Sequence, residues 1–136
     1  MENSPPGVAG KSSTGLDDNI AALLTYIFGW VSGLIFFLIE KDSKLVRFHA
    51  MQSILFNVLV LVLLIVFWIV FGILFVILAQ ISDALGGLAG ILGFLLWLAF
   101  AIIALGAVIL CMVRAYQRQF FKLPFIGNMA EKIVNK

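Results

Sequence analysis

The sequence predicts an all-α, polytopic membrane protein with three transmembrane helices and a short C-terminal interfacial helix. Of its 136 residues, 63% are hydrophobic and 12% are charged, whereas a soluble domain is about 45–50% apolar and about 25% charged. The apolar residues also form three long runs separated by short polar turns. Each run is long enough to cross a bilayer core, which needs about 20 apolar residues in a helix. The length of the chain leaves room for one membrane domain, residues 17–136.

Residues 1–16 are predicted to form a disordered tail, because they are rich in Pro, Gly and Ser and show no apolar periodicity. The stretch GVAGKSS is not a phosphate-binding loop, since Pro5 stands where that motif needs its first glycine. The tail lacks the basic segment of a signal peptide, and the acidic Asp17 and Asp18 precede the first apolar run. We therefore expect neither nucleotide binding nor a cleaved leader.

The first predicted span covers about residues 20–39, which carry no charge. Asp17 and Asp18 suit its start, because carboxylates stabilise the positive end of a helix. Gly29 and Gly33 form a G-x-x-x-G pair, and such small faces let membrane helices approach closely. We favour packing of this face inside the monomer over dimerisation.

The central span is predicted over about residues 45–81, with Ser43 as a plausible N-cap. Residues 58–79 contain neither a charge nor an amide. At 1.5 Å per residue this helix is longer than the ~30 Å hydrocarbon core. We therefore expect it to tilt and to protrude from the membrane at its charged end.

The third span is predicted over about residues 84–113, again without a charge or an amide. Gly86 and Gly90 form a second G-x-x-x-G pair, with Gly93 close by, and we expect all three to pack against another helix. Cys111 is the only cysteine. It excludes an internal disulfide and is predicted to be a small packing residue.

The segment 114–136 is predicted to lie at the membrane interface, where basic and aromatic residues anchor membrane proteins. Its expected anchors are Arg114, Tyr116, Arg118, Lys122 and Pro124.

A short helix is predicted over residues 129–134, because Asn128 and Glu131 have the spacing of a capping box. This helix would present Met129 and Ile133 to the membrane surface, while its lysines face water and anionic lipid.

The distribution of positive charge predicts the orientation of the chain. Three basic residues flank the first turn and five follow the third span, against one in the tail and none in the second turn. We therefore expect a cytoplasmic C-terminus and an external N-terminus, in a prokaryotic plasma membrane. Because the basic residues adjoin membrane ends, we do not expect nucleic-acid binding.

The central helix carries a polar face near its charged end. His49, Ser53 and Asn57 are spaced i, i+4 and i+8, and Arg47 and Gln52 adjoin them. The favoured interpretation is hydrogen bonding between helices, which is common in membrane proteins. The alternative is a cytoplasmic vestibule for protons, ions or a peptide, since polar groups in lipid face protein or water.

No catalytic or metal-binding constellation is evident. The chain has one His, one Cys and no pair of carboxylates inside a predicted span, so acid–base and metal chemistry lack their usual residues. Ser53 and His49 are four residues apart, but a helix surface supplies no oxyanion hole. We expect no enzyme activity, no metal and no cofactor.

Two stretches carry a family resemblance, LDDNIAALLTYIFGWVSGLIFFLIEKDSKLVRFHAMQSILF and FKLPFIGNMAEK. The most specific residues in them are Arg47-Phe48-His49-Ala50, Gln52-Ser53 and Lys122-Leu123-Pro124 with Gly127. The chain resembles the small membrane proteins related to the twenty-kilodalton subunit of the chloroplast inner-envelope protein-import translocon, a family with uncharacterised bacterial and archaeal members. The resemblance implies an accessory membrane component.

The expected function is therefore that of a non-enzymatic integral membrane protein that acts through helix packing. Its expected partners are the lipid bilayer and other membrane proteins or further copies of itself. The alternative is a small homo-oligomeric channel or transporter, with the polar face of the central helix lining a cytoplasmic vestibule.

Overall fold

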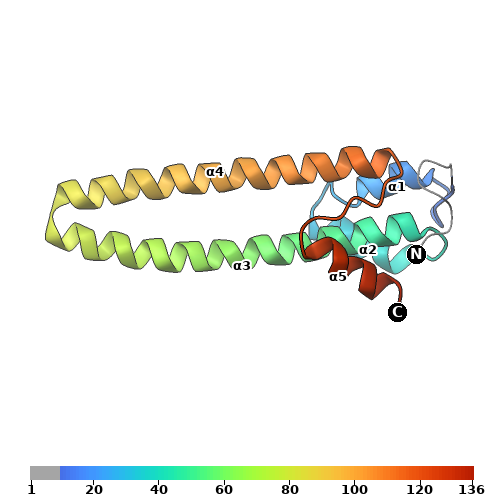
Figure 1. Cartoon of the computed structure of the whole chain (residues 1–136), viewed down its shortest axis with the longest axis horizontal. Coiled ribbons are helices and arrows are strands. Elements are labelled where there is room, and N and C mark those ends of the chain that lie inside the picture. The colour runs from blue at the N-terminus through green and yellow to red at the C-terminus, as the bar shows by residue number, and fades with distance from the viewer. Residues whose placement is uncertain (1–9) are drawn as a thin grey trace. The chain divides into compact units, whose positions relative to one another are not determined.

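The computed structural model describes residues 10–136, and over these residues it contains helices and no strands. The all-α prediction is therefore confirmed (Figure 1). The helices in chain order are α1 (Asp18–Leu24), α2 (Trp30–Ile39), α3 (Lys44–Ile81), α4 (Asp83–Tyr116) and α5 (Ile126–Val134).

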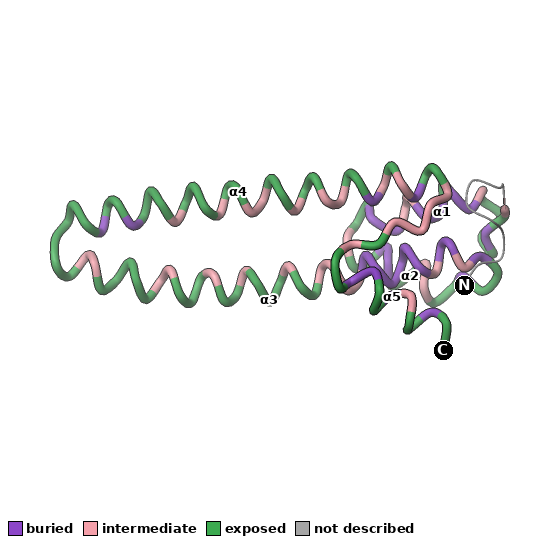
Figure 2. The backbone as a smooth tube through the Cα atoms, in the orientation of Figure 1, coloured by how far each residue is buried: buried purple, intermediate pink, exposed green. Residues whose placement is uncertain are grey.

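The chain divides into two compact units. The polar unit comprises Met1–Val58, described from residue 10 onward, and Val108–Lys136, and the apolar unit comprises Leu59–Ala107. Figure 2 shows that buried residues are concentrated in the polar unit, whereas the apolar unit is mostly exposed.

Two helices, α3 and α4, are long and apolar enough to cross a membrane. They have 38 and 34 residues, and they closely match the second and third predicted spans. Serine side chains cap both starts: Ser43 Oγ accepts the Val46 amide at 3.4 Å, and Ser82 Oγ accepts the Leu85 amide at 3.1 Å. Uncharged sequence and well-formed caps thus explain these two elements.

The prediction of one continuous helix over residues 20–39 is wrong. The stretch forms two helices of 7 and 10 residues, and neither reaches the ~20 residues that a span needs. The break ends at Gly29, whose φ of 60° is in the left-handed region. Ser32 Oγ stabilises the break by donating to the Thr25 carbonyl at 2.9 Å and accepting the Phe28 amide at 3.1 Å.

The two short helices form a hairpin within the polar unit. Glu40, directly after α2, accepts hydrogen bonds from Ser12 and Ser13, which precede α1. The chain therefore leaves and returns at the same end of this unit. These bonds also correct the predicted tail boundary, because residues 10–16 make defined contacts; residues 1–9 lie outside the described part of the chain.

The C-terminal helix starts earlier than predicted. α5 begins at Ile126, and the residue before it, Phe125, has a φ of 64°. The expected capping box does not form, because Asn128 lies inside α5 and Glu131 instead pairs with Lys122. Gly127 allows the early start, since a Cβ at this position would collide with Lys122.

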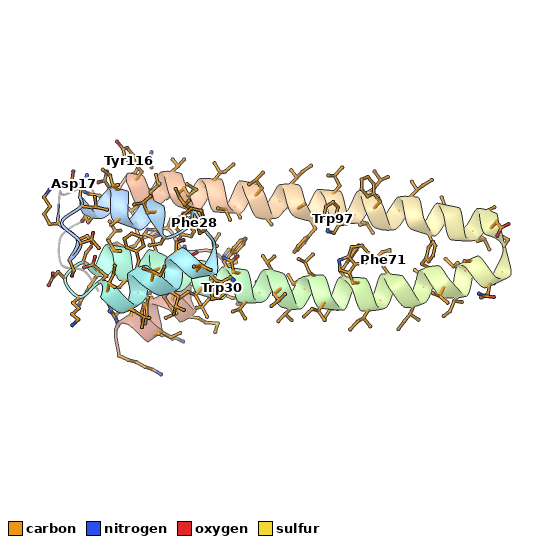
Figure 3. The ribbon with its side chains drawn as sticks, turned by 180° about the vertical axis from the view of Figure 1, so that it is seen from behind. Asp17, Phe28, Trp30, Phe71, Trp97 and Tyr116 are labelled. Atoms are coloured by element: carbon orange, nitrogen blue, oxygen red, sulfur yellow. The ribbon has the colours of Figure 1, made fainter. Side chains whose placement is uncertain are left out.

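The apolar unit is a pair of helix segments that touch closely at only a few places. A Cβ on Gly86 would lie 2.9 Å from the Ala79 Cβ, and one on Gly93 would lie 3.2 Å from the Phe71 ring. An apolar groove of about 430 Å³ separates the segments elsewhere, and Phe71 and Trp97 face one another across it (Figure 3). Asp83 is the only charged residue in this unit.

Candidate functional site

The predicted polar face lies in the core of the polar unit. His49, Gln52 and Ser53 have no exposed surface, while Arg47 and Asn57 are partly buried. All five residues belong to the first four turns of α3. The structure therefore brings the five predicted residues together, and we call them with their bonded partners the polar core.

A single chain of hydrogen bonds passes through the imidazole of His49. Its Nε2 lies 2.8 Å from the Gln119 carbonyl oxygen, which only accepts, so the network assigns the proton to Nε2. Nδ1 then accepts from the Tyr26 hydroxyl at 2.8 Å. That hydroxyl accepts in turn from Gln52 Nε2 at 3.1 Å. Along this series of hydrogen bonds, it is therefore fixed which group donates and which accepts at each step.

Gln52 and His49 also bind the non-helical segment between α4 and α5. Gln52 Nε2 donates to the Phe121 carbonyl at 3.0 Å, and its Oε1 accepts the Leu123 amide at 3.1 Å. Gln119, bound by His49, belongs to the same segment. Backbone groups outside a helix need partners when they leave water, and these α3 side chains supply them.

Ser53 performs the same task for the break between α1 and α2. Its Oγ donates to the Gly29 carbonyl at 3.1 Å. Asn57 contacts the same turn, since a Cβ on Gly29 would lie 3.0 Å from its Oδ1, but its Nδ2 donates to the Ser53 carbonyl of its own helix at 2.8 Å. The polar face of α3 therefore holds two interruptions of the helical backbone, the break before α2 and the segment before α5.

The polar core is closed by its own hydrogen bonds. Among the described residues, every buried side-chain nitrogen and oxygen has a hydrogen-bond partner. Ser53 donates to a backbone carbonyl, and His49 is bonded to Tyr26 and Gln119, so the serine is not paired with a base. Within residues 10–136 no cluster of three His, Cys, Asp or Glu side chains is placed to hold a metal ion.

A second polar cluster surrounds Glu40 at the charged end of the unit. Its fully buried carboxylate accepts bonds from the Ser12 hydroxyl, from the Ser13 amide at 2.9 Å and from the Ser43 amide at 3.0 Å. Burial alone would raise the pKa of Glu40, but the hydrogen bonds from Ser12, Ser43 and Ser13 together lower that pKa to about 2. Arg47 Nη1 donates to the Glu40 carbonyl at 2.8 Å, which ties α3 to the same turn.

A third cluster joins the start of α1 to the end of α4. The Arg118 guanidinium donates to Asp18 at 2.7 Å and to the Asn19 amide oxygen at 3.1 Å, and Asn19 Nδ2 donates to the Tyr116 carbonyl at 3.1 Å. Figure 3 shows Asp17 and Tyr116 at this same end of the polar unit. The predicted placement of the two termini on opposite sides of the membrane is not confirmed.

The predicted interfacial anchors differ in their surroundings. Arg114 donates to Gln119 Oε1 at 2.9 Å and lies over the Phe121 ring, and Lys122 pairs with Glu131. Tyr116 is 55% exposed, and Pro124 is also exposed. The basic anchors therefore hold the segment after α4 in place through intramolecular contacts.

The predicted packing glycines pack inside the units. Gly33 on α2 lies so close to α3 that a Cβ would be 2.9 Å from the Ala50 carbonyl oxygen. Gly86, Gly90 and Gly93 on α4 face Ala79, Phe75 and Phe71 of α3. Gly29 differs from these, because it forms the turn before α2 rather than a flat helix face.

Sequence reasoning missed Tyr26, Glu40 and Gln119 as members of the site. Tyr26 lies in a run of apolar residues, Glu40 begins a short polar turn, and Gln119 acts through its backbone carbonyl. One signal was present: Thr25-Tyr26-Ile27-Phe28-Gly29 combines β-branched residues, aromatics and glycine, which are weak helix formers. That composition weakens a helix but does not by itself predict a break, because Ile69-Val70-Phe71-Gly72 shares it and lies within the continuous helix α3.

The two long apolar helices and the closed polar core together define a small helical membrane protein. Residues 16–130 match the magnetosome magnetite crystal formation protein family. The chain belongs to this family.

Curated relatives from archaea agree with this assignment. A UPF0132 membrane protein of Methanocaldococcus jannaschii is 40% identical over 125 residues, covering 90% of this chain and 94% of the relative. A UPF0132 membrane protein of Archaeoglobus fulgidus is 32% identical over 117 residues, covering 86% and 95%. A second Methanocaldococcus jannaschii protein is 35% identical over 121 residues, covering 87% and 71%.

These matches confirm one part of the expected family resemblance and give no support to the other. The chain has uncharacterised prokaryotic relatives that are membrane proteins, as expected. Nothing in the matches links it to the chloroplast translocon subunit. No solved structure matches the chain.

Proposed function

We propose that this chain is a non-enzymatic integral membrane protein that acts by helix packing with other membrane proteins or with further copies of itself. The observation that carries the proposal is the closed polar core. Its side chains are used to hold two interruptions of the backbone, so they are structural supports. The exposed apolar unit, whose one charged residue is Asp83, is the surface available to partner helices.

The proposal includes a revised topology with two spans, α3 and α4, and both termini in the cytoplasm. All nine Lys and Arg residues lie outside the apolar unit, and the turn between α3 and α4 has none. The excess of positive charge is therefore on one side only, which is the cytoplasmic side in membrane proteins. The Asp18–Arg118 pair supports this topology, because it joins the chain before α1 to the chain after α4.

This topology is tested by cysteine labelling in intact cells with a membrane-impermeant maleimide. All three tested positions, Lys11, Asn135 and Ser82, are exposed on the protein surface, so each can carry a reactive cysteine. Lys11→Cys and Asn135→Cys should be protected by the membrane, because they would be cytoplasmic. Ser82→Cys, in the turn on the opposite side, should react. The native Cys111 is buried and provides the background. Labelling of Lys11→Cys alongside Ser82→Cys would overturn the shared cytoplasmic placement.

The channel alternative would need His49 and Gln52 to face water. Both side chains have no exposed surface, and both are bonded to the backbone between α4 and α5. The family's printed description concerns magnetite crystal formation. A packing role in a membrane that contains other proteins is compatible with that description, and we propose no mineral contact for this chain.

The functional test combines the native mass of the purified protein with a measurement of ion flux through vesicles that contain it. In mild detergent, the native mass should show a defined assembly with stoichiometric partner proteins or further copies. Vesicles containing the purified protein should show no ion flux, and His49→Leu should lower thermal stability. Flux through the wild-type protein that disappears in a folded His49→Leu variant would replace the packing role with the channel.

A further inference from the structure

The last helix, α5, has two apolar faces, and only one of them is covered by the protein. Ile126, Ala130 and Val134 are buried, the last two in a cluster with Phe48 and Met51 of α3. The uncovered face is a stripe at i, i+4 and i+8 formed by Phe125, Met129 and Ile133, which are 84%, 52% and 36% exposed. We call these three residues the free face of α5.

The direction of α5 orders its residues along α3. Gly127, near the start of α5, lies beside Gln52, and the helix then runs back toward the charged start of α3 (Figure 1). The Phe125 end is therefore nearer to the apolar part of α3 than the Lys136 end. An apolar deep end and a basic shallow end fit the change from acyl chains to head groups within one leaflet.

Phe125 is held outward by its backbone. Its φ of 64° is strained for a bulky side chain, and its ring is 84% exposed. An exposed ring gains nothing in water that would offset this strain, whereas transfer into hydrocarbon is favourable. An apolar environment outside the chain would offset this strain by removing the Phe125 side chain from water.

Two lysines beside the free face are available for anions. Lys132 and Lys136 are exposed, and the ion pairs among the described residues use Lys11, Arg118 and Lys122 instead. All Lys and Arg residues of the chain belong to the polar unit, which also contains α5. Anionic phospholipid head groups complement this charge.

We propose that the free face of α5 inserts into the cytoplasmic leaflet, with Phe125 among acyl chains and with Lys132 and Lys136 bound to the phosphates of anionic phospholipids. The occupant of this face is thus lipid of the host membrane rather than a protein. The proposal does not depend on which proteins pack against the apolar unit.

The test places an environment-sensitive fluorophore on the free face of the full-length protein, through Met129→Cys in a Cys111→Ala background. Asn135→Cys, at the exposed C-cap residue that follows α5, is the control. In vesicles, lipids brominated on their acyl chains should quench the label at position 129 several-fold more than the label at 135. Adding phosphatidylglycerol to phosphatidylcholine should blue-shift the emission at position 129.

Charge removal then isolates the head-group contribution. Lys132→Gln with Lys136→Gln should abolish the phosphatidylglycerol-dependent shift, and Lys11→Gln, an exposed lysine paired with Asp17, should leave it unchanged. High salt should weaken the shift, because exposed charges are screened. Two results would overturn the proposal: equal quenching at both labels, or a signal at position 129 that follows the protein-to-lipid ratio and ignores lipid charge, which would assign the face to a second copy.

Discussion

The polar unit and the apolar unit differ in how they satisfy their backbones. In the apolar unit, two helix segments pair nearly all of their own amides and carbonyls, and the Ser82 cap of α4 is the side-chain bond that their backbone receives at the turn. In the polar unit, the backbone is interrupted before α2 and again before α5, and side chains of α3 bind the exposed groups. Polar residues occur where helices stop.

This difference gives the polar face of α3 a physical meaning. His49, Gln52 and Ser53 are the hydrogen-bond partners of Gln119, Phe121, Leu123 and Gly29. In this chain, the polar stripe on α3 marks the irregular backbone that packs against it. Substitutions made in one unit at a time test this comparison through their effects on stability.

The largest effect is expected from Gln52→Leu. The substitution leaves the Phe121 carbonyl and the Leu123 amide without partners and removes the bond to Tyr26. Each buried unpaired backbone group costs about 1–3 kcal/mol, so the loss should be on the order of 3 kcal/mol or more. Reversible unfolding in mixed detergent micelles measures this loss.

Asn57→Leu is the matched control for that experiment. It removes a polar side chain from the same helix face, but the lost bond runs only to the Ser53 carbonyl of its own helix. The expected cost is below about 1 kcal/mol. Equal costs for the two variants would show that the irregular backbone does not depend on Gln52.

An acid-dependent loss of stability is expected next, and it should belong to the polar unit. The pKa of Glu40 is lowered from 4.5 to about 2 in the folded protein, so its contribution is complete above pH 4.5 and is lost as the pH falls toward 2. Complete protonation should remove on the order of 2–3 kcal/mol. Thermal unfolding in detergent across this pH range measures the slope.

Glu40→Gln separates this effect from general acid denaturation. The variant should be less stable at neutral pH and should show a flatter profile between pH 4.5 and 2. Lys11→Gln, which alters an exposed pair with Asp17, should leave the profile close to that of the wild type. An unchanged slope in Glu40→Gln would assign the acid sensitivity to other carboxylates.

The sequence predicted the apolar unit better than the polar unit, for a physical reason. Charge-free length and capping residues define α3 and α4, and these are local properties. The break at Gly29 depends on Ser53 of another helix, and the start of α5 depends on Gly127 fitting beside Gln52. The polar residues themselves were recognisable, but their backbone partners lie up to 71 positions away and carry no signal in side-chain type.

A smaller effect is expected from Gly33→Ala in the polar unit. The added Cβ would lie 2.9 Å from the Ala50 carbonyl oxygen and 3.2 Å from the Ser53 Cβ, so α2 must move away from α3. Overpacking of this kind costs about 1–3 kcal/mol, partly offset by the better helix propensity of alanine. Unfolding in mixed micelles should show a net destabilisation. An unchanged midpoint would mean that α2 is less tightly docked than its glycine suggests.

The smallest effect, and one of opposite sign, is expected from Gly72→Ala in the apolar unit. Gly72 lies within α3 beside the aromatic groove, and no atom lies within 4 Å of the position that its Cβ would occupy. Alanine should therefore stabilise the helix by up to about 1 kcal/mol, since it restricts the unfolded chain without a steric cost. Unfolding in dilute micelles measures the stability of the monomer.

The same variant should also be more stable in vesicles at a high protein-to-lipid ratio if lipid fills the space beside Gly72. Destabilisation or a changed assembly state only in vesicles would show that a partner helix packs on Gly72, and it would place the proposed packing surface beside the aromatic groove.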